Sequence, residues 1–324
     1  MESASVQQAP SKVQGVPLWI RARRVLERYI VSIVSWIVRR MSRERTMKLA
    51  VTFGNIFHAN FRRYRKVADE CLQLAFKEKY DDKDRQRIVK SSGIYLMKTM
   101  LDFIRFGNMS KEEILALAPE VNGKEHLEAA FEKSDGGVIG LTGHIGSWEY
   151  CGVWVVASGW HLAAVGKEQR DPGVTKMMID AREQTGINHI SRTKQGNREI
   201  IKALKRKNWM LGLISDQNGG KDGVYVDFFG IKASSIRGPA FLALRYGIPV
   251  VPIFAIWEGD NYRMEIMPEV NLTRSGDEEK DIVENTQRFQ KILERMVEKY
   301  PEQWLWAHRR WKTRPEGEPM IHKW

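Results

Sequence analysis

A histidine and a glutamate five positions apart stand out among the residues that could do chemistry. They lie in the segment Thr142-Gly-His-Ile-Gly-Ser-Trp-Glu149, which follows a short apolar run at 137–142 that predicts a buried strand. In an open α/β sheet, ligands bind at the carboxyl ends of the strands. A neutral imidazole can take up a proton near pH 7, and a carboxylate bonded to its other nitrogen fixes its tautomer. We therefore expect His144 to be a general base oriented by Glu149; the alternative is an ordinary hydrogen-bonded histidine at a strand end.

Small residues between His144 and Glu149 leave room for a substrate beside the backbone. Gly143 and Gly146 have no side chains, so main-chain amides there can approach a substrate oxygen. Ser147 is a rival nucleophile in the same segment. A serine nucleophile elbow has the pattern Gly-x-Ser-x-Gly, and Glu149 replaces its last glycine, so the sequence favours the histidine base.

Two other segments carry candidate binding residues. Asp216 directly follows the apolar run at 210–214, where it either faces a ligand or forms a turn. The second segment places two hydroxyls and a cation just before a helix expected to begin near Pro239: Ser234, Ser235 and Arg237. Helix N-termini and arginine both favour phosphate or carboxylate groups, although proline in the first helical turn is also common helix punctuation.

The elements that must position these residues alternate along the chain. Helical patterns separate short apolar runs, which predicts an α/β fold with a central mixed sheet flanked by helices. Expected strands lie at 137–142, 162–165, 187–190, 209–215, 224–228, 250–257 and 263–267, and expected helices at 148–157, 174–185, 197–207, 238–246 and 279–299. We expect a disordered tail at 1–16, a helical, membrane-associating region at 17–110, the α/β domain at 111–314 and a C-terminal tail at 315–324.

The expected N-terminal helix has a basic and amphipathic character. Its apolar run Tyr29–Val38 is ten residues long, whereas a bilayer-spanning helix needs roughly 20. Arginines precede and follow this run, which suits a helix lying in the interface of an anionic membrane; a core-packed helix with solvated ends is the alternative.

The whole chain is basic and rich in tryptophan. Its formal net charge is +12 and it has eleven tryptophans, which together favour an anionic membrane surface over nucleic acid as a partner. The C-terminal run Trp304-Leu-Trp-Ala-His-Arg-Arg-Trp-Lys-Thr-Arg314 interleaves aromatics with cations, either for stacked or cation–π packing or for contact with lipid headgroups.

Cysteine and histidine usage indicates neither a disulfide framework nor a metal site. Cys71 and Cys151 are far apart, which is consistent with a reducing compartment. The seven histidines do not show ligand spacing, and the Gly219-Gly220 pair lacks the context of a nucleotide-binding loop. We therefore expect no cofactor.

Several blocks in order resemble the bacterial lipid A biosynthesis acyltransferases, the lauroyl- or myristoyl-transferring type within the lysophospholipid acyltransferase-like superfamily. The segment His144-Ile-Gly-Ser-Trp-Glu149 is similar to the family's His-x4-Asp/Glu motif. The other similar blocks are Asp216-Gln217 with 223–230, then 238–252, and His308-Arg-Arg-Trp-Lys312. Together the resembling blocks span 137–314, over half of the chain.

This resemblance implies that His144 is the base on an acceptor hydroxyl and Glu149 its partner. It also implies a thioester donor, acyl carrier protein or acyl-CoA, a lipid acceptor, and attachment at the cytoplasmic face of the inner membrane, which the short apolar run makes peripheral. Substrate contacts are expected from Lys167, Arg170, Asp216 and Arg237; Lys167 replaces a usual arginine and Arg237 a usual threonine.

Other activities stay open at this stage. A thioesterase or other hydrolase would use the same His–Glu pair on water. The acceptor could be another lysophospholipid or a mannoside, because mycobacterial-type mannoside acyltransferases share the motifs. Charge alone also allows a non-enzymatic protein that binds membranes or nucleic acid.

Overall fold

The computed structural model describes residues 18–166 and 171–322. Its sheet strands are β1 (Glu120–Asn122), β2 (Val138–Thr142), β3 (His161–Gly166), β4 (Ile187–Ser191), β5 (Trp209–Ile214), β8 (Val250–Glu258) and β9 (Asn261–Ile266), and a separate hairpin has β6 (Val224–Phe228) and β7 (Ile231–Ser235). The helices are α1 (Leu18–Val38), α2 (Arg43–Asn60), α3 (Arg62–Phe76), α4 (Asp82–Phe106), α5 (Lys111–Ala116), α6 (Lys124–Lys133), α7 (Trp148–Ala157), α8 (Pro172–Gln184), α9 (Lys194–Leu204), α10 (Gly238–Tyr246) and α11 (Glu278–Lys299).

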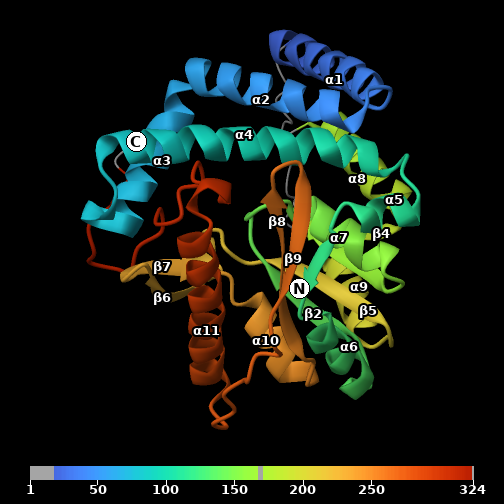
Figure 1. Ribbon diagram of the computed structural model, residues 1–324. Coiled ribbons are helices and arrows are strands. Elements are labelled where there is room, and N and C mark those ends of the chain that lie inside the picture. The colour runs from blue at the N-terminus through green and yellow to red at the C-terminus, as the bar shows by residue number, and fades with distance from the viewer. Residues whose placement is uncertain (1–17, 167–170, 323–324) are drawn as a thin grey trace, which may run out of the picture.

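The seven-stranded sheet is mixed and has helices packed around it (Figure 1). Its order is β1-β9-β8-β2-β5-β3-β4, and every neighbouring pair is parallel except the antiparallel pair β8–β9. All five residues of the central strand β2 are buried, as a continuous apolar run requires in a sheet covered on both faces. The α/β class and the central mixed sheet are therefore confirmed.

Most of the expected elements are present at nearly the expected positions, with two additional strands. The short strand β1 pairs with β9, and β7 pairs with β6 in the hairpin outside the main sheet. Both additional strands lack an apolar run: β1 reads Glu-Val-Asn, and β7 contains Lys, Ala and two Ser residues. Pairing with a neighbour, and not side-chain pattern, makes them strands. The expected disordered tail at 1–16 lies outside the described residues.

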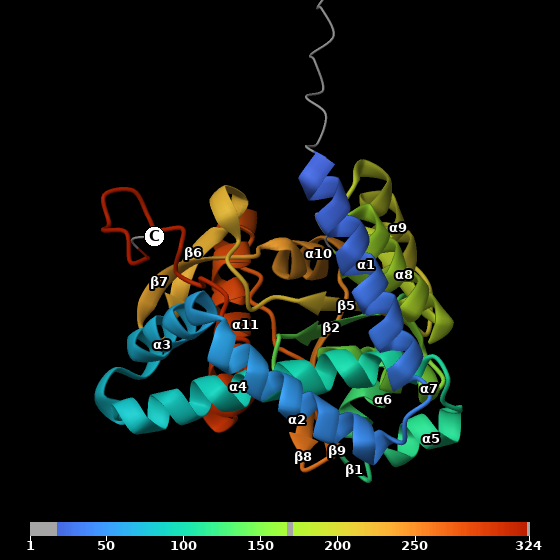
Figure 2. The ribbon, with the colours of Figure 1, turned by 90° about the horizontal axis from the view of Figure 1, so that it is seen from above.

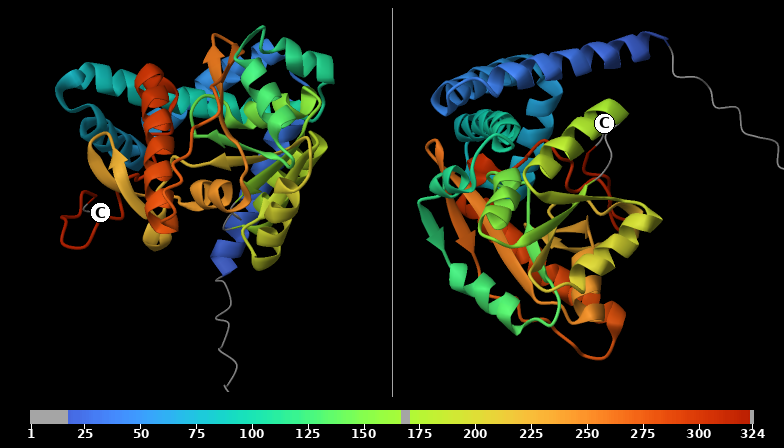
Figure 3. Two further views of the ribbon diagram at one scale, coloured as in Figure 1. Left: turned by 90° about the horizontal axis from the view of Figure 1, so that it is seen from below. Right: turned by 90° about the vertical axis from the view of Figure 1, so that its right-hand side faces the viewer.

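The N-terminal helices form a layer over one side of the sheet. Figures 1 and 3 show α4 running along this side, with α1 and α2 stacked outside it. Helices α2 and α4 approach closely at Gly54, where an added Cβ would lie 2.6 Å from Ile94 Cα. A side chain at Gly54 would push the two helices apart.

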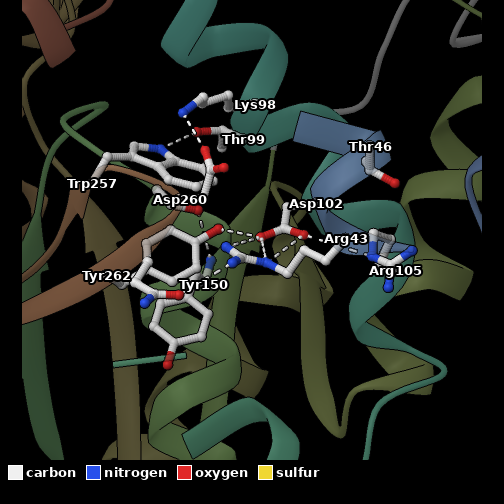
Figure 4. Close-up of polar contacts among 12 residues, drawn as sticks. Arg43, Thr46, Lys98, Thr99, Asp102, Arg105, Tyr150, Trp257, Asp260 and Tyr262 are labelled. Carbon is white, nitrogen blue, oxygen red and sulfur yellow. Dashed lines mark hydrogen bonds and ion pairs between the residues drawn. The ribbon is translucent and has the colours of Figure 1, made fainter. Parts of the chain in front are cut away.

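A buried polar network joins this helical layer to the sheet (Figure 4). The fully buried Asp102 of α4 accepts hydrogen bonds from the Arg43 guanidinium of α2, at 2.9 Å, and from the Tyr262 hydroxyl of β9, at 2.7 Å. On the same helix, the Lys98 ammonium bonds to Asp260 at 2.8 Å. Because a buried carboxylate must keep its partners, these contacts fix the helical layer on the sheet.

Helix α1 lies alongside α8, as the view in Figure 2 shows. Its Arg28 pairs with Asp171 at 3.7 Å, and Arg39 donates to the Gln184 side chain at 3.2 Å. The apolar middle of α1 is not buried: Ile33 is 57% and Trp36 59% exposed. The core-packed alternative for this helix is therefore wrong. Within the described residues, no helix is both long enough and apolar enough to cross a bilayer.

Candidate active site

His144 lies directly beyond the carboxyl end of β2, and Asp216 directly beyond the carboxyl end of β5. The two strands are parallel neighbours in register, with Thr142 opposite Ile214. The His144 ring Nδ1 lies 2.8 Å from Asp216 Oδ1, and the His144 backbone N–H donates to Asp216 Oδ2 at 2.7 Å. Sheet pairing therefore brings together a histidine and a carboxylate that are 72 residues apart in sequence.

Asp216 is held as a buried carboxylate. Asp216 is 1% exposed, and its carboxylate has a third hydrogen bond, from the Trp304 indole N–H to Oδ2 at 2.7 Å. Burial alone would raise the pKa of Asp216, but the charge and hydrogen bonds of His144 and the bond from Trp304 bring it down to about 2. An ionised carboxylate can only accept, so Nδ1 carries the ring proton and Nε2 is left as the basic nitrogen.

The opposite edge of the His144 ring is partly accessible. The side chain is 18% exposed, and its ring packs edge-on against Trp148 with centroids 4.8 Å apart. The Gln217 side-chain amide lies 3.5 Å from Nε2. A substrate hydroxyl that reaches Nε2 would meet a base whose tautomer is already selected.

Glu149 does not occupy the place expected of it. It lies in the first turn of α7, and its carboxylate accepts two hydrogen bonds from Arg182 of α8, at 2.6 and 3.1 Å. Both side chains are nearly buried. This corrects the expected His144–Glu149 contact, because Asp216 holds Nδ1 while the helix directs Glu149 towards α8.

Burial alone would lower the pKa of Arg182, but the charge and hydrogen bonds of Glu149 raise it overall. The Arg182 Nη1 also lies 3.3 Å from His189 Nδ1 of β4. The Glu149–Arg182 ion pair thus links the start of α7 to α8, and through His189 to the edge strand β4.

A small apolar cavity lies beside Glu149, between α7 and the sheet. Its volume is about 60 Å³, and its lining includes Trp148, Val155 and Ile253. Three glycines also line it, Gly140, Gly152 and Gly212. An added Cβ at Gly140 would lie 2.5 Å from Met210 Sδ, so a side chain there would displace the neighbour that borders the cavity.

The loop between β2 and α7 is held by backbone hydrogen bonds. The Gly146 N–H donates to the Gln303 carbonyl, and the Ser147 N–H to the Ala255 carbonyl. These amides are therefore engaged and do not offer the free donors expected from the small residues. Gly146 has φ +62°, and an added Cβ would lie 2.0 Å from Ala255 O, so only glycine fits there. The fully buried Ser147 caps α7 by accepting from the Tyr150 N–H.

The C-terminal run of aromatics and cations at 304–314 contacts the strand-end segment that carries Asp216. Trp304 bonds to Asp216, and His308 Nε2 accepts a hydrogen bond from the Asn218 N–H at 2.9 Å. Burial lowers the pKa of His308 to about 4, which keeps this acceptor neutral. The fully buried Arg310 donates to the Ser234 carbonyl and to Gln290, at 2.6 and 3.0 Å. The aromatics and cations of the run pack within the protein: the Trp304 and Trp306 rings meet edge to face with centroids 4.5 Å apart, and the Arg310 guanidinium lies 4.9 Å over the Phe228 ring.

The anion site expected before α10 is not assembled. The Ser234 hydroxyl donates to the Gly220 carbonyl, and the Ser235 hydroxyl donates to the Ala233 carbonyl; both serines are fully buried. The Arg237 guanidinium pairs with Glu279 at 2.6 Å. Each of these three side chains therefore already has a partner within the protein. Lys167 and Arg170 lie outside the described residues.

Two residues of the site, Arg182 and Trp304, were not identified as site residues from the sequence. Arg182 lies inside an ordinary amphipathic helix, where arginine normally faces solvent. Trp304 belongs to a run whose aromatics suggested stacking. The feature that marks Trp304 is its N–H hydrogen bond to Asp216, a contact between residues 88 positions apart that no local pattern in the sequence predicts.

Comparison with known proteins relates the chain to bacterial acyltransferases. A family model described as bacterial lipid A biosynthesis acyltransferase matches residues 20–313. The chain is 24% identical over 298 residues to a lipid A biosynthesis lauroyltransferase of Escherichia coli, covering 88% of this chain and 91% of that protein. It is 23% identical over 295 residues to a lipid A biosynthesis acyltransferase of Haemophilus influenzae, covering 90% and 88%.

A mycobacterial relative is also similar over a shorter stretch. The chain is 28% identical over 190 residues to a phosphatidylinositol mannoside acyltransferase of Mycolicibacterium smegmatis, covering 58% of this chain. The match spans 60% of that relative's own length.

Proposed function

This chain belongs to the bacterial lipid A biosynthesis acyltransferase family, and on that premise we propose that it is an O-acyltransferase acting on a glycolipid. The substrates would be an acyl thioester donor and a hydroxyl of a lipid A precursor or a related glycolipid. The observation that carries the proposal is the His144–Asp216 pair at the ends of two neighbouring parallel strands. Its geometry orients the imidazole with Nε2 turned away from the carboxylate, as attack by a hydroxyl through a general base requires.

The proposed reaction uses His144 Nε2 twice. Nε2 takes the proton of the acceptor hydroxyl while the hydroxyl oxygen attacks the thioester carbonyl and forms the new C–O bond. The C–S bond then breaks, and the imidazolium returns its proton to the leaving thiolate. Asp216, whose pKa is about 2, stays ionised throughout and stabilises the imidazolium.

Glu149 is proposed as a positioning residue that acts through Arg182. Their two hydrogen bonds fix the start of α7, which carries the Trp148 ring packed against His144. The apolar cavity beside Glu149 is proposed to receive the beginning of the acyl chain, because it is lined by apolar side chains and glycines next to the base.

Helix α1 supports the proposal that the protein works at the cytoplasmic surface of the inner membrane. Its exposed apolar side chains include Trp19, Tyr29, Ile33 and Trp36. Arg40 packs its guanidinium 4.2 Å over the Trp36 ring. Amphipathic helices with tryptophan and arginine insert their apolar side among lipid headgroups and favour anionic lipids. The net charge of +12 also favours an acidic donor such as acyl carrier protein over acyl-CoA alone.

The mycobacterial relative supports a mannoside as the alternative acceptor. The test is an assay with acyl carrier protein thioester and, in parallel, a lipid A precursor, a phosphatidylinositol mannoside, or no acceptor. We expect acyl transfer to one acceptor and its loss in His144→Ala, whereas Ser147→Ala, which removes the rival nucleophile, should retain transfer. Free acid released at the same rate without acceptor would identify a thioesterase and refute the transfer proposal.

A further inference from the structure

We propose that an open basic hollow beside the His144 site binds a phosphoryl group of a substrate. The hollow has a volume of about 600 Å³ and lies between the start of α3 and the C-terminal segment. It is lined by Phe61, Arg63, Tyr64, Val67, Asn218, Ala307, His308, Arg309 and Lys312. The inference rests on the proposed acyl transfer and concerns how one of its substrates is held.

The charge of the hollow is entirely positive. Arg63, Arg309 and Lys312 contribute cations, and no acidic side chain is among the lining residues that the structure describes. Arg63 and Lys312 are exposed, and within residues 18–166 and 171–322 neither forms an ion pair. By contrast, the largely buried arginines Arg43 and Arg85 each pair with a carboxylate. Two exposed cations in one hollow without a carboxylate partner in the described part of the chain, Arg63 and Lys312, favour an anionic ligand.

The hollow is connected to the catalytic pair through a single short segment. Asn218, in its wall, follows Gln217, whose side chain lies 3.5 Å from His144 Nε2, and Asp216, which holds Nδ1. The Asn218 N–H donates to His308 Nε2, which ties this segment to the C-terminal wall. The wall of the hollow is therefore continuous with the segment that carries Asp216 and Gln217.

Exposed apolar side chains in and near the hollow indicate a lipid substrate. Phe61 in its wall is 55% exposed, and Ile56, five residues earlier in α2, is 53% exposed. Apolar side chains next to the exposed cations Arg63 and Lys312 match the boundary of a lipid layer, where headgroup phosphates lie. Both substrate classes offer a phosphate: the pantetheine arm of the thioester donor, and the headgroup of a phosphorylated glycolipid. The shared chemistry is a phosphoryl group bound by arginine and lysine.

The test compares the full chain with Arg63→Gln, Lys312→Gln and the double variant, and uses Lys202→Gln on the exposed side of α9 as the matched control. KM is measured for acyl-CoA against the same acyl chain on pantetheine without its phosphate, and for a lipid A precursor with and without its phosphates. We expect the double variant to raise KM about tenfold or more for one phosphorylated substrate, with kcat nearly unchanged. The dephosphorylated counterpart and the control should show no change.

Each arm has a defined outcome. A rise confined to acyl-CoA assigns the hollow to the donor, and a rise confined to the phosphorylated acceptor assigns it to the headgroup. Equal KM values in the double variant and the Lys202→Gln control for all four substrates overturn the inference. Binding of inorganic pyrophosphate to the full chain is the independent readout: weaker binding in the double variant supports the hollow even if the wild-type protein transfers no acyl group, which would refute only the proposed function.

Discussion

Replacement of Asp216 by asparagine tests the His144–Asp216 pair most directly, because it keeps the shape of the side chain but replaces one acceptor oxygen with an NH₂ donor. Asp216 Oδ2 accepts hydrogen bonds from the His144 N–H and from Trp304, whereas Oδ1 faces the ring Nδ1. In Asp216→Asn, the single amide oxygen is expected to keep the two donors, which places the NH₂ group against Nδ1. A donor there selects the tautomer with its proton on Nε2, and that nitrogen can no longer accept the proton of a hydroxyl.

The expected magnitude is large. A carboxylate-to-amide change that imposes the wrong histidine tautomer lowers kcat by about 10⁴ in a serine protease, and we expect a loss of roughly 10³ to 10⁴ here. At 1.36 kcal/mol for each factor of ten, this corresponds to roughly 4–5.5 kcal/mol of transition-state stabilisation. KM should change little, because neither nitrogen of the ring contributes much ground-state binding.

The assay is single-turnover acyl transfer from acyl carrier protein thioester to the lipid acceptor that the wild-type protein uses. His144→Ala and the double variant are measured alongside, and the double variant should lose no more than the worse single variant, because the two residues act as a unit. Circular dichroism checks that each variant is folded. Asp216→Asn with kcat within tenfold of wild type, or a double variant with multiplied losses, would refute the assignment of Asp216 as the partner of His144.

Three further outcomes follow from the buried groups. Arg182→Met should lower the free energy of unfolding by roughly 3 kcal/mol or more by leaving Glu149 buried and unpaired, and the double variant Arg182→Met/Glu149→Gln should recover much of it in urea denaturation. Asp102→Ala should cost a similar amount by stranding the Arg43 guanidinium, and an exposed change such as Lys202→Gln should cost nothing measurable in the same titration. Burial lowers the pKa of His308 to about 4 in the folded protein, so between about pH 6.5 and 4 only the unfolded ring binds a proton, and the free energy of unfolding should decrease as the pH falls. His308→Gln should flatten this dependence of the free energy of unfolding on pH, and an unchanged slope would contradict the assignment.

The sequence determined the elements and one half of the chemical pair. Apolar runs at 137–142 and 209–215 predicted β2 and β5, and helical periodicity predicted α7 and α11 to within a residue or two. These patterns are local, because burial on both faces of a strand or on one face of a helix leaves its period in the residues themselves. The same locality placed His144 at the mouth of a helix beyond a strand end.

The tertiary structure alone decided which carboxylate meets the histidine. Glu149 is five residues away and Asp216 is 72 residues away, yet Asp216 holds the ring because β2 and β5 are neighbours in the sheet. Strand order is set by long-range pairing and leaves no mark on the spacing of residues along the chain. The same reason applies to Trp304, which reaches Asp216 from the C-terminal segment, and to Arg182, which takes Glu149 away from the role its proximity suggested.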